Sequence, residues 1–96
     1  MIRKAALTDV QAIHRLLVGY ARDGLVLPRS IAEIYESIRD FHVCEQDGLV
    51  ASVVALSIYW EGLAEVRSLA VHSEYSGRGI GRDLVAACLD EARSLG

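Results

Sequence analysis

The sequence predicts an α/β fold of the α+β kind, with one mainly antiparallel sheet and the element order β-α-α-β-β-β-α. Three observations indicate this class: two N-terminal segments with apolar residues at helical spacing, an Asp-Gly dipeptide between two β-rich runs, and a strongly helical C-terminal segment. The chain has 96 residues, of which 52% are hydrophobic, so we expect one compact domain and not a disordered linker.

A short strand is expected over residues 2–6, and the first helix follows it over about residues 9–20. Thr8 and Gln11 match a capping box, in which each side chain satisfies a free backbone donor at the start of a helix. Apolar residues then recur at helical spacing, at Val10, Ile13, Leu16, Leu17 and Tyr20.

The second helix is expected to be short and to follow a loop over residues 24–29. Ser30 and Glu33 repeat the capping-box pattern at its start. The apolar stripe behind this cap consists of Ile31, Ile34, Tyr35 and Ile38.

Three strands of a meander follow, over residues 41–45, 49–59 and 64–71. Between the first two lies Asp47-Gly48, a dipeptide that tolerates positive φ and is typical of a tight hairpin turn. Gly62 marks the next turn. These strands are therefore expected to pair as antiparallel neighbours.

The last segment is a glycine-rich turn, with Gly77, Gly79 and Gly81, that opens a long helix. The first turn of a helix has unpaired N–H groups and a partial positive charge, and glycine lets an anion approach the backbone closely. Arg78 and Arg82 add positive charge four residues apart. The pattern favours a phosphate site, although the glycines alone would also suit a tight connection between strand and helix.

Two common nucleotide motifs do not fit this turn. The dinucleotide fingerprint G-x-G-x-x-G needs a parallel βαβ unit, but here position 84 is leucine and hairpins link the preceding strands. A P-loop needs Lys and then Ser or Thr after its last glycine, whereas this chain has Arg82-Asp83.

At these residues the sequence resembles the GNAT superfamily of N-acetyltransferases, and the resemblance covers the whole chain. The family's acetyl-CoA motif reads Q/R-x-x-G-x-G/A, and residues 76–81 match it at both glycines. Ser76 stands where the family has Gln or Arg. Because family members hold the pyrophosphate mostly through main-chain N–H groups, the resemblance implies weakened and not abolished cofactor binding.

The resemblance implies a GNAT fold and acetyl-CoA as the cofactor. In the family, the strand before the glycine turn carries a bulge, and the pantetheine arm lies in the gap that the bulge opens. Leu69 and Val71 would then offer backbone groups to that arm. The implied cofactor-binding residues are Leu69, Ala70, Val71, Ser76, Gly77, Arg78, Gly79, Ile80, Gly81 and Arg82.

Glu65 occupies a strand position where several family members place a general base. A base is needed because an ammonium group has no lone pair and must lose a proton before it attacks a thioester. An ion pair with Arg67, two residues further along the same face, is an equally open interpretation. Glu61 is the reserve candidate for the base.

The acceptor is expected to be a small amino acid, with glutamate first, because the chain looks like the amino-acid acetyltransferases of the N-acetylglutamate synthase type. That resemblance rests on the leucine-rich loop before the second helix and on the phrases at residues 55–60 and 65–68. It implies N-acetylation in arginine biosynthesis. Arg29 and Arg67 are the candidates for the acceptor carboxylates, because guanidinium offers a planar fork to a carboxylate, but each could equally be an exposed or structurally paired arginine. Tyr59 and Trp60 would border the acceptor cleft or act as packing groups. The alternatives are another amine acceptor (a protein N-terminus, an amino sugar or a polyamine) and a non-catalytic acyl-CoA-binding module.

The formal charge of −3 argues against nucleic acid or an anionic membrane as a partner. Cys44 and Cys88 lack a metal-binding spacing, so no metal site is expected and both are expected to be reduced core thiols. Without an N-terminal signal pattern or a long apolar run, the protein is expected in the cytoplasm.

By the resemblance, residues 1–96 are a single GNAT domain truncated after its cofactor-binding helix. The family's next strand and, in many members, a tyrosine general acid would lie beyond Gly96. We therefore expect slow or absent acetylation by the 96-residue chain, and an open sheet edge that would favour a homodimer.

Overall fold

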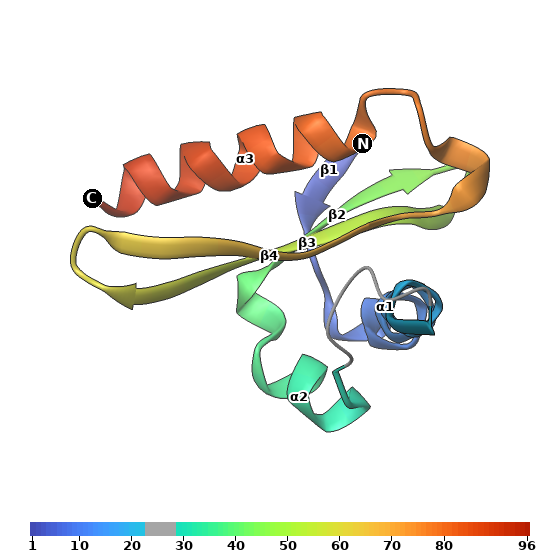
Figure 1. The fold of residues 1–96 in the computed structure, drawn as a ribbon, viewed down its shortest axis with the longest axis horizontal. Helices are drawn as coiled ribbons and strands as arrows, with labels where there is room; N and C mark the ends of the chain where they lie inside the picture. Colours follow the sequence, from blue (N-terminus) through green and yellow to red (C-terminus); the bar gives the residue numbers. More distant parts are fainter. Residues whose placement is uncertain (23–28) are drawn as a thin grey trace.

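The computed structural model describes residues 1–22 and 29–96, with residues 20–22 described by their backbone alone. The order of helices and strands is the predicted one, and Figure 1 shows how they are arranged. The elements are β1 (Ile2–Lys4), α1 (Val10–Arg22), α2 (Ile31–Glu36), β2 (Phe41–Gln46), β3 (Leu49–Trp60), β4 (Leu63–Val71) and α3 (Ile80–Leu95). The loop predicted over residues 24–29 lies outside the described residues except at Arg29.

The four strands form one sheet in the order β1-β2-β3-β4, and each neighbouring pair is antiparallel. Helix α3 lies on one face of the sheet, and α1 and α2 lie on the other (Figure 1). The C-terminal end of α3 lies near the β3–β4 hairpin, while its N-terminal end follows the end of β4 through a short connection. The fold therefore has three layers. The N-terminal end of α3, called its mouth below, is joined to β4 by residues 72–79.

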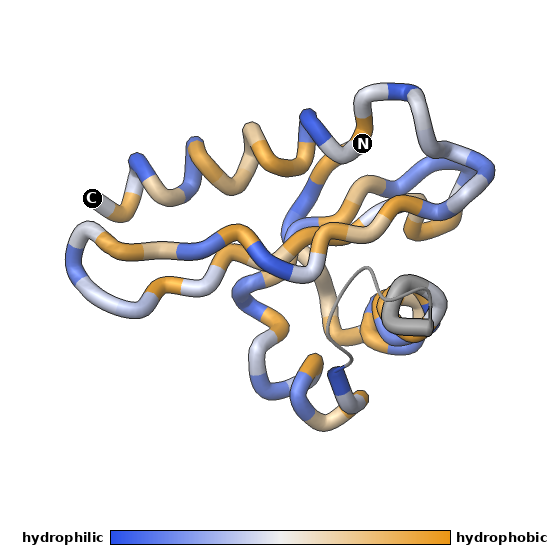
Figure 2. The backbone as a smooth tube through the Cα atoms, in the orientation of Figure 1, coloured by the Kyte–Doolittle hydropathy of each residue, from blue (hydrophilic) through white to orange (hydrophobic). Residues whose placement is uncertain are grey.

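Each face of the sheet has its own hydrophobic core, because successive side chains of a strand point to opposite faces. Hydrophobic residues along the strands are visible in Figure 2. The core under α1 and α2 contains Val10, Ile13, Leu17, Ile34, Phe41, Val43, Val53, Ala55 and Ala70. The core under α3 contains Cys44, Ala51, Val54, Leu56, Tyr75, Ile80, Leu84 and Cys88. Cys44 and Cys88 are both free thiols and buried, as expected.

The predicted start of the first helix was wrong in its cap. A 3₁₀ turn over Leu7–Asp9 precedes α1, so Thr8 lies inside a helical turn and not before it. The carboxylate of Asp9 accepts the N–H of Ala6 at 2.7 Å and also pairs with Arg3 at 2.7 Å. Because Asp9 forms both bonds, the helical turn begins at Leu7, two residues before the predicted helix start at residue 9.

The cap of the second helix and the first hairpin are confirmed. The Ser30 N–H donates to Glu33 Oε1 at 3.0 Å, and the Glu33 N–H donates to Ser30 Oγ at 3.1 Å, which is a complete capping box. Asp47 and Gly48 both have positive φ, at 52° and 77°, as a two-residue hairpin turn of this kind requires.

A β-bulge interrupts β4 where it pairs with β3. Val53 pairs with Ala70 and Ala55 pairs with Arg67, so Ser68 and Leu69 together face the single residue Val54. Ser68 has a φ of 57°, which gives the strand its local bend. This is the bulge that the family resemblance led us to expect before the glycine turn.

Candidate functional site

The glycine turn ends in a helix start that is open to an approaching anion. Gly77 and Gly79 have φ values of 81° and 77°, and Gly79 is the N-cap of α3. The Asp83 N–H makes the first intrahelical bond, to the Gly79 carbonyl at 3.1 Å. The N–H groups of the preceding residues have no acceptor inside the helix. A Cβ on Gly77 would meet no heavy atom within 4 Å, so the turn is reached from open space.

The predicted anion-binding arginines flank this turn. The Arg78 guanidinium lies over the ring of Tyr75, 5.2 Å from its centroid. A Cβ on Gly79 would lie 3.0 Å from Arg82 Nη2, so Arg82 folds back toward the turn. Its ion pair with Asp83 is long, at 3.9 Å, and exposed. Both cations are thus placed beside the open helix start.

The other predicted cofactor residues serve the local structure. The Ser76 hydroxyl donates to the Ser73 carbonyl at 3.1 Å and so holds the turn before the glycines. Ile80 is buried in the core under α3. A Cβ on Gly81 would meet side-chain atoms of Leu69 and Val71 at 3.6 to 3.9 Å, so α3 packs closely on β4 there. Ala70 is buried on the opposite face of the sheet.

The predicted acceptor residues gather on the face that α1 and α2 cover. Phe41, Ala55 and Arg67 are in register across β2, β3 and β4, so their side chains share that face. The Arg29 guanidinium lies over the Phe41 ring, 5.2 Å from its centroid. Since neighbouring strands lie about 4.8 Å apart, Phe41 and Arg67 are separated by roughly 10 Å.

Arg29 is a half-buried cation. Its Nη1 donates to Ser37 Oγ at 3.4 Å. Burial lowers the pKa of Arg29, and the neighbouring positive charge of Arg67 lowers it further, while Asp40 and Glu33 act in the other direction. Because the positive charges of these two arginines repel each other, a carboxylate placed between them would be stabilised.

Glu65 lies on the same face as Arg67, since it pairs with Ser57 two residues along β3. Its side chain is 57% exposed, and its Oε1 lies 3.6 Å from Arg67 Nε. Arg67 Nη1 also donates to the hydroxyl of Tyr59 at 3.0 Å. The sequence does not predict that Tyr59 contacts Arg67. The antiparallel pairing of β3 with β4 brings the two side chains together. The ion pair is present, and the Glu65 carboxylate remains exposed to solvent.

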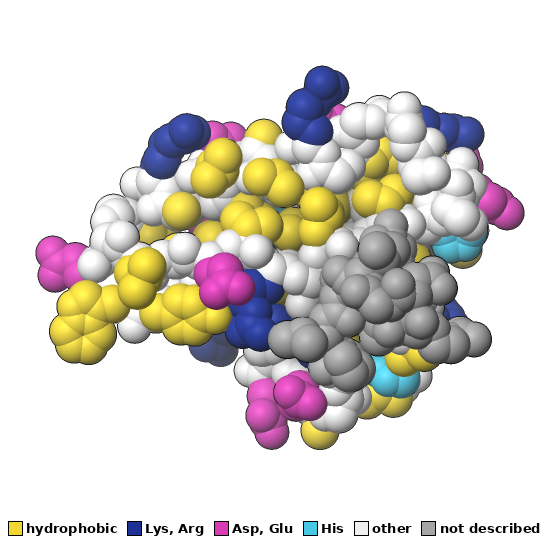
Figure 3. Space-filling model, viewed as in Figure 1, with side chains coloured by type: hydrophobic (Ala, Val, Ile, Leu, Met, Phe, Trp, Pro, Cys, Tyr) yellow, Lys and Arg dark blue, Asp and Glu magenta, His cyan; other side chains and the backbone are white. Residues whose placement is uncertain are grey.

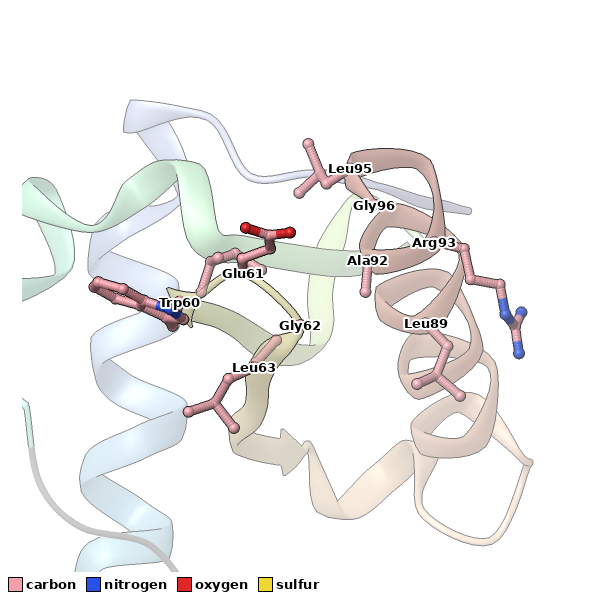
Figure 4. Close-up of a pocket in the computed structure, with 11 residues that line it drawn as sticks. Trp60, Glu61, Gly62, Leu63, Leu89, Ala92, Arg93, Leu95 and Gly96 are labelled. Carbon is pink, nitrogen blue, oxygen red and sulfur yellow. The ribbon is translucent and has the colours of Figure 1, made fainter.

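The reserve candidate, Glu61, lies apart from this group. It occupies the β3–β4 turn, outside both strands, and borders a separate cleft of about 600 Å³ between the hairpin and the last turns of α3 (Figure 4). Hydrophobic side chains gather between α3 and the sheet and along the hairpin in Figure 3. The cleft is lined by Ile58, Trp60, Glu61, Gly62, Leu63, Ala64, Leu89, Ala92, Arg93, Leu95 and Gly96.

Within the described residues, no group of three or more His, Cys, Asp or Glu side chains is arranged to hold a metal ion. Among the helices of residues 1–22 and 29–96, none combines the length and the apolar character that crossing a membrane requires.

An antiparallel sheet with a bulged strand that runs into a glycine-capped helix defines an α+β domain whose helix start is suited to an anion. Residues 10–96 match the model of the acetyltransferase (GNAT) family, and the chain belongs to that family. It is 48% identical over 84 residues to an uncharacterized N-acetyltransferase of Chlorobaculum tepidum, covering 88% of this chain and 54% of that protein. It is 36% identical to an amino-acid acetyltransferase of Mycobacterium tuberculosis, covering 99% of this chain and 56% of that protein.

Solved structures of this family superpose closely on the chain. A Mycobacterium tuberculosis protein crystallised with CoA and NLQ has a TM-score of 0.94 at 35% identity, covering 99% of this chain and 58% of that one. An N-acetylglutamate synthase from Neisseria gonorrhoeae, complexed with coenzyme A and N-acetyl-glutamate, has a TM-score of 0.95 at 31% identity, covering 100% and 23%. The chain spans about half the length of the curated relatives that it matches first.

Proposed function

We propose that this chain is the acetyl-CoA-binding part of an N-acetyltransferase that acetylates the amino group of a small amino acid, with glutamate as the first candidate. The observation that carries the proposal is the open start of α3, where Gly77 and Gly79 adopt positive φ beside Arg78 and Arg82. Solved relatives that contain CoA, and relatives named amino-acid acetyltransferase, support this assignment.

In this proposal, main-chain N–H groups of residues 77–82 hold the pyrophosphate of CoA, and Arg78 and Arg82 add charge. The bulge at Ser68–Leu69 turns backbone groups of β4 away from the β3 ladder, and Leu69, Ala70 and Val71 line the path of the pantetheine arm. The thioester supplies an activated acyl carbon. The protein's part is to hold the donor and to deliver a neutral amine to it.

Arg29 and Arg67 are the proposed carboxylate-binding residues for the acceptor, because both guanidinium groups lie on one face of the sheet. Glu65 is the proposed general base that takes a proton from the ammonium group, directly or through water. Tyr59 holds Arg67 by a hydrogen bond, and the Arg67 side chain is still 36% exposed. This arrangement can serve an acceptor that carries both an amine and carboxylates.

The proposal places the reaction in arginine biosynthesis, which the relatives named N-acetylglutamate synthase support. The two buried, unpaired cysteines agree with a reducing compartment, so we propose the cytoplasm. We further propose that the molecule forms homodimers, since β4 ends the described sheet with β3 as its paired neighbour.

Binding of CoA is tested by a matched pair of glycine variants. Gly79→Leu and Gly62→Leu both force a side chain into positive φ, at 77° and 76°, so both carry similar backbone strain. Only the first places atoms at the mouth of α3. We expect calorimetry to show at least a tenfold weaker affinity for CoA in Gly79→Leu and an unchanged affinity in Gly62→Leu. Equal affinities in the two variants would refute the site.

The acceptor is tested by an amine screen led by glutamate, in which CoA thiol release and acetylated product are both measured. This screen and the kinetic measurements below use a chain extended past residue 96. The panel includes aspartate, glutamine, an amino sugar, a polyamine and a peptide with a free N-terminus. Product from glutamate alone, or from glutamate first, supports the proposal. If glutamate gives none while another amine does, the amino-acid assignment fails although the acetyltransferase assignment stands.

A further inference from the structure

Tyr75 stands at a joint between two parts of the molecule that are far apart in sequence. It ends the 3₁₀ turn Ser73–Tyr75, just before the glycine turn, and only 7% of it is exposed. Its hydroxyl donates to Asp47 Oδ2 at 3.1 Å, in the β2–β3 hairpin. Burial raises the pKa of Tyr75, and the bond to Asp47 raises it further, so the phenol keeps its proton at neutral pH.

The Tyr75 ring also contacts Arg78, a cation of the glycine turn. The Arg78 guanidinium lies 5.2 Å from the centroid of the Tyr75 ring, and the His72 ring meets that ring edge-on at 5.9 Å. His72 is itself fixed to the sheet, because its N–H donates to the Ala51 carbonyl at 2.7 Å. The platform under Arg78 is therefore tied to β3 through His72 and to the hairpin turn through Asp47.

A long arginine side chain on a surface turn would otherwise sample many rotamers, and ordering it on binding costs conformational entropy. Stacking on an aromatic face restricts that freedom before the ligand arrives. Arg82, the second arginine of the turn, has no aromatic platform among its described contacts, and its side chain is 85% exposed. The two arginines therefore differ in how far each is oriented in advance.

We propose that Tyr75 is a positioning residue for the phosphate group of CoA: it holds the Arg78 guanidinium at the mouth of α3 and anchors the glycine turn to Asp47 of the β2–β3 hairpin. This inference rests on the proposed function, since it assigns a residue to the same cofactor site. It adds a residue of the hairpin and one of the 3₁₀ turn to a site otherwise made of the glycine turn and β4.

The anchor is tested with variants that separate the ring from the hydroxyl. Tyr75→Phe keeps the ring under Arg78 and removes the bond to Asp47, while Tyr75→Leu removes both. Asp47→Gly removes the acceptor but suits the positive φ of 52°, and Asp47→Asn restores an oxygen acceptor at that φ. Tyr35→Phe, on the exposed side of α2, is the control. The readouts are the Kd for CoA and the KM for the acceptor.

We expect Tyr75→Leu to weaken CoA binding by about two- to fivefold, the range for loss of a partly exposed cation–π contact. Tyr75→Phe and Asp47→Gly are expected to weaken it less, Asp47→Asn to restore it, and Tyr35→Phe to leave it unchanged. The KM for the acceptor is expected to stay constant throughout. Parallel changes in the acceptor KM and the CoA Kd would indicate a purely structural role and overturn the proposal.

A double-mutant cycle with Arg78→Gln tests the link between the two residues. If Tyr75 acts through Arg78, then Arg78→Gln costs less affinity in the Tyr75→Leu background than in the wild type. Additive losses would overturn the inference while leaving the proposed function intact. A wild-type chain that does not bind CoA would remove both, so the two failures are distinguishable. If Tyr75→Leu does not fold, the same cycle with Tyr75→Met, which also lacks an aromatic ring, replaces it.

Discussion

Glu65 in β4 is both paired and accessible to solvent. Its carboxylate lies 3.6 Å from Arg67 Nε, and its side chain is 57% exposed. An exposed ion pair of this kind contributes little to stability, so the pair by itself gives a weak reason for the residue. The proposed role of Glu65 as a general base is a separate function that can be tested. We predict that Glu65→Gln lowers kcat by about 10²- to 10⁴-fold while the Kd for CoA is unchanged.

The matched control for Glu65 is Glu61→Gln, because Glu61 lies in the β3–β4 turn and borders the separate cleft. Steady-state rates at several pH values measure both variants. A Glu65→Gln enzyme with nearly full kcat would leave the carboxylate as a partner of Arg67 alone.

Arg29 is the second residue whose chemistry is open to a direct test. It stacks on Phe41 and is half-buried, so its planar fork is oriented before a carboxylate arrives. Arg29→Lys keeps the charge but loses the fork and the stacking. We predict at least a tenfold higher KM for glutamate with an unchanged KM for acetyl-CoA. Arg15→Lys, on the exposed side of α1, is expected to change neither. An unchanged KM in Arg29→Lys would remove Arg29 from the acceptor site.

At the residue scale, the placement of the glycine turn and its arginines at the start of α3 could be predicted, because it depends on backbone conformation and local spacing. Tyr59 and Tyr75 could not. Tyr59 reaches Arg67 only through the register of β3 and β4, and Tyr75 reaches Asp47 from 28 residues away. Contacts of that range leave no periodic signal in a sequence.

Among the elements, α3 is joined to β1 and β2 by a partly buried polar group around His42. The His42 Nδ1 lies 3.7 Å from Cys88 Sγ, and its Nε2 lies 3.7 Å from Glu91 Oε2. Lys4 of β1 pairs with the same Glu91 at 2.9 Å. Burial lowers the pKa of His42 below its usual 6.5, Lys4 lowers it further, and Glu91 acts in the other direction.

The sign of the pH dependence follows from that shift. At about pH 7.5 and above, His42 is neutral in both the folded and the unfolded chain and contributes no slope. Below that pH, the unfolded chain takes up the proton first, so the free energy of unfolding falls until the folded group also protonates. We predict that urea unfolding shows lower stability at pH 5.5 than at pH 7.5, and that His42→Gln removes part of this difference.

The control for His42 is His14→Gln in α1, which is expected to keep the wild-type difference between the two pH values. Burial also raises the pKa of Cys88, so this thiol stays neutral in the same range and does not add a charge to the group. If His42→Gln retains the full pH dependence, other groups carry it.

At the scale of elements, the sequence predicted best what is decided within a few residues. Ser30 and Glu33 form their capping box, and Asp47-Gly48 forms its turn, because each needs only its own neighbours. The start of the first helix differs from the prediction because Arg3 of β1 pairs with Asp9 across the turn. The helical start therefore lies earlier in the chain. The residue pattern around Thr8 does not show that Asp9 pairs with Arg3 of a neighbouring strand.

For the whole molecule, the sheet separates the two halves of the proposed chemistry. The acceptor residues lie on the face of α1 and α2, whereas the cofactor turn opens α3 on the other face. The bulge at Ser68–Leu69 follows Arg67 directly in β4. Arg67 faces α1 and α2, whereas Leu69 and Val71 face α3. The bulge therefore lies where an acyl group held by one layer would meet an amine held by the other. Its existence was expected from the resemblance, but its register depends on pairing with β3.

The cleft between the β3–β4 hairpin and the end of α3 exposes apolar side chains to solvent. Trp60 is 77% exposed at its rim, and Leu89 is 45% exposed on α3. Contiguous apolar surface of this kind binds apolar dyes and favours association. We predict that the 96-residue chain binds the dye ANS, and that Leu89→Glu reduces the dye fluorescence at least severalfold.

The free energy of unfolding should stay within about 0.5 kcal/mol of wild type in Leu89→Glu, because the side chain is half-exposed. The new carboxylate also lies four residues before Arg93, a spacing that favours the helix. Leu49→Glu removes a comparably exposed leucine, at 59%, from the start of β3 outside the cleft, and should leave dye binding unchanged. Fluorescence titration and urea unfolding measure the two effects. Equal dye binding in both variants would place the apolar site elsewhere on the molecule.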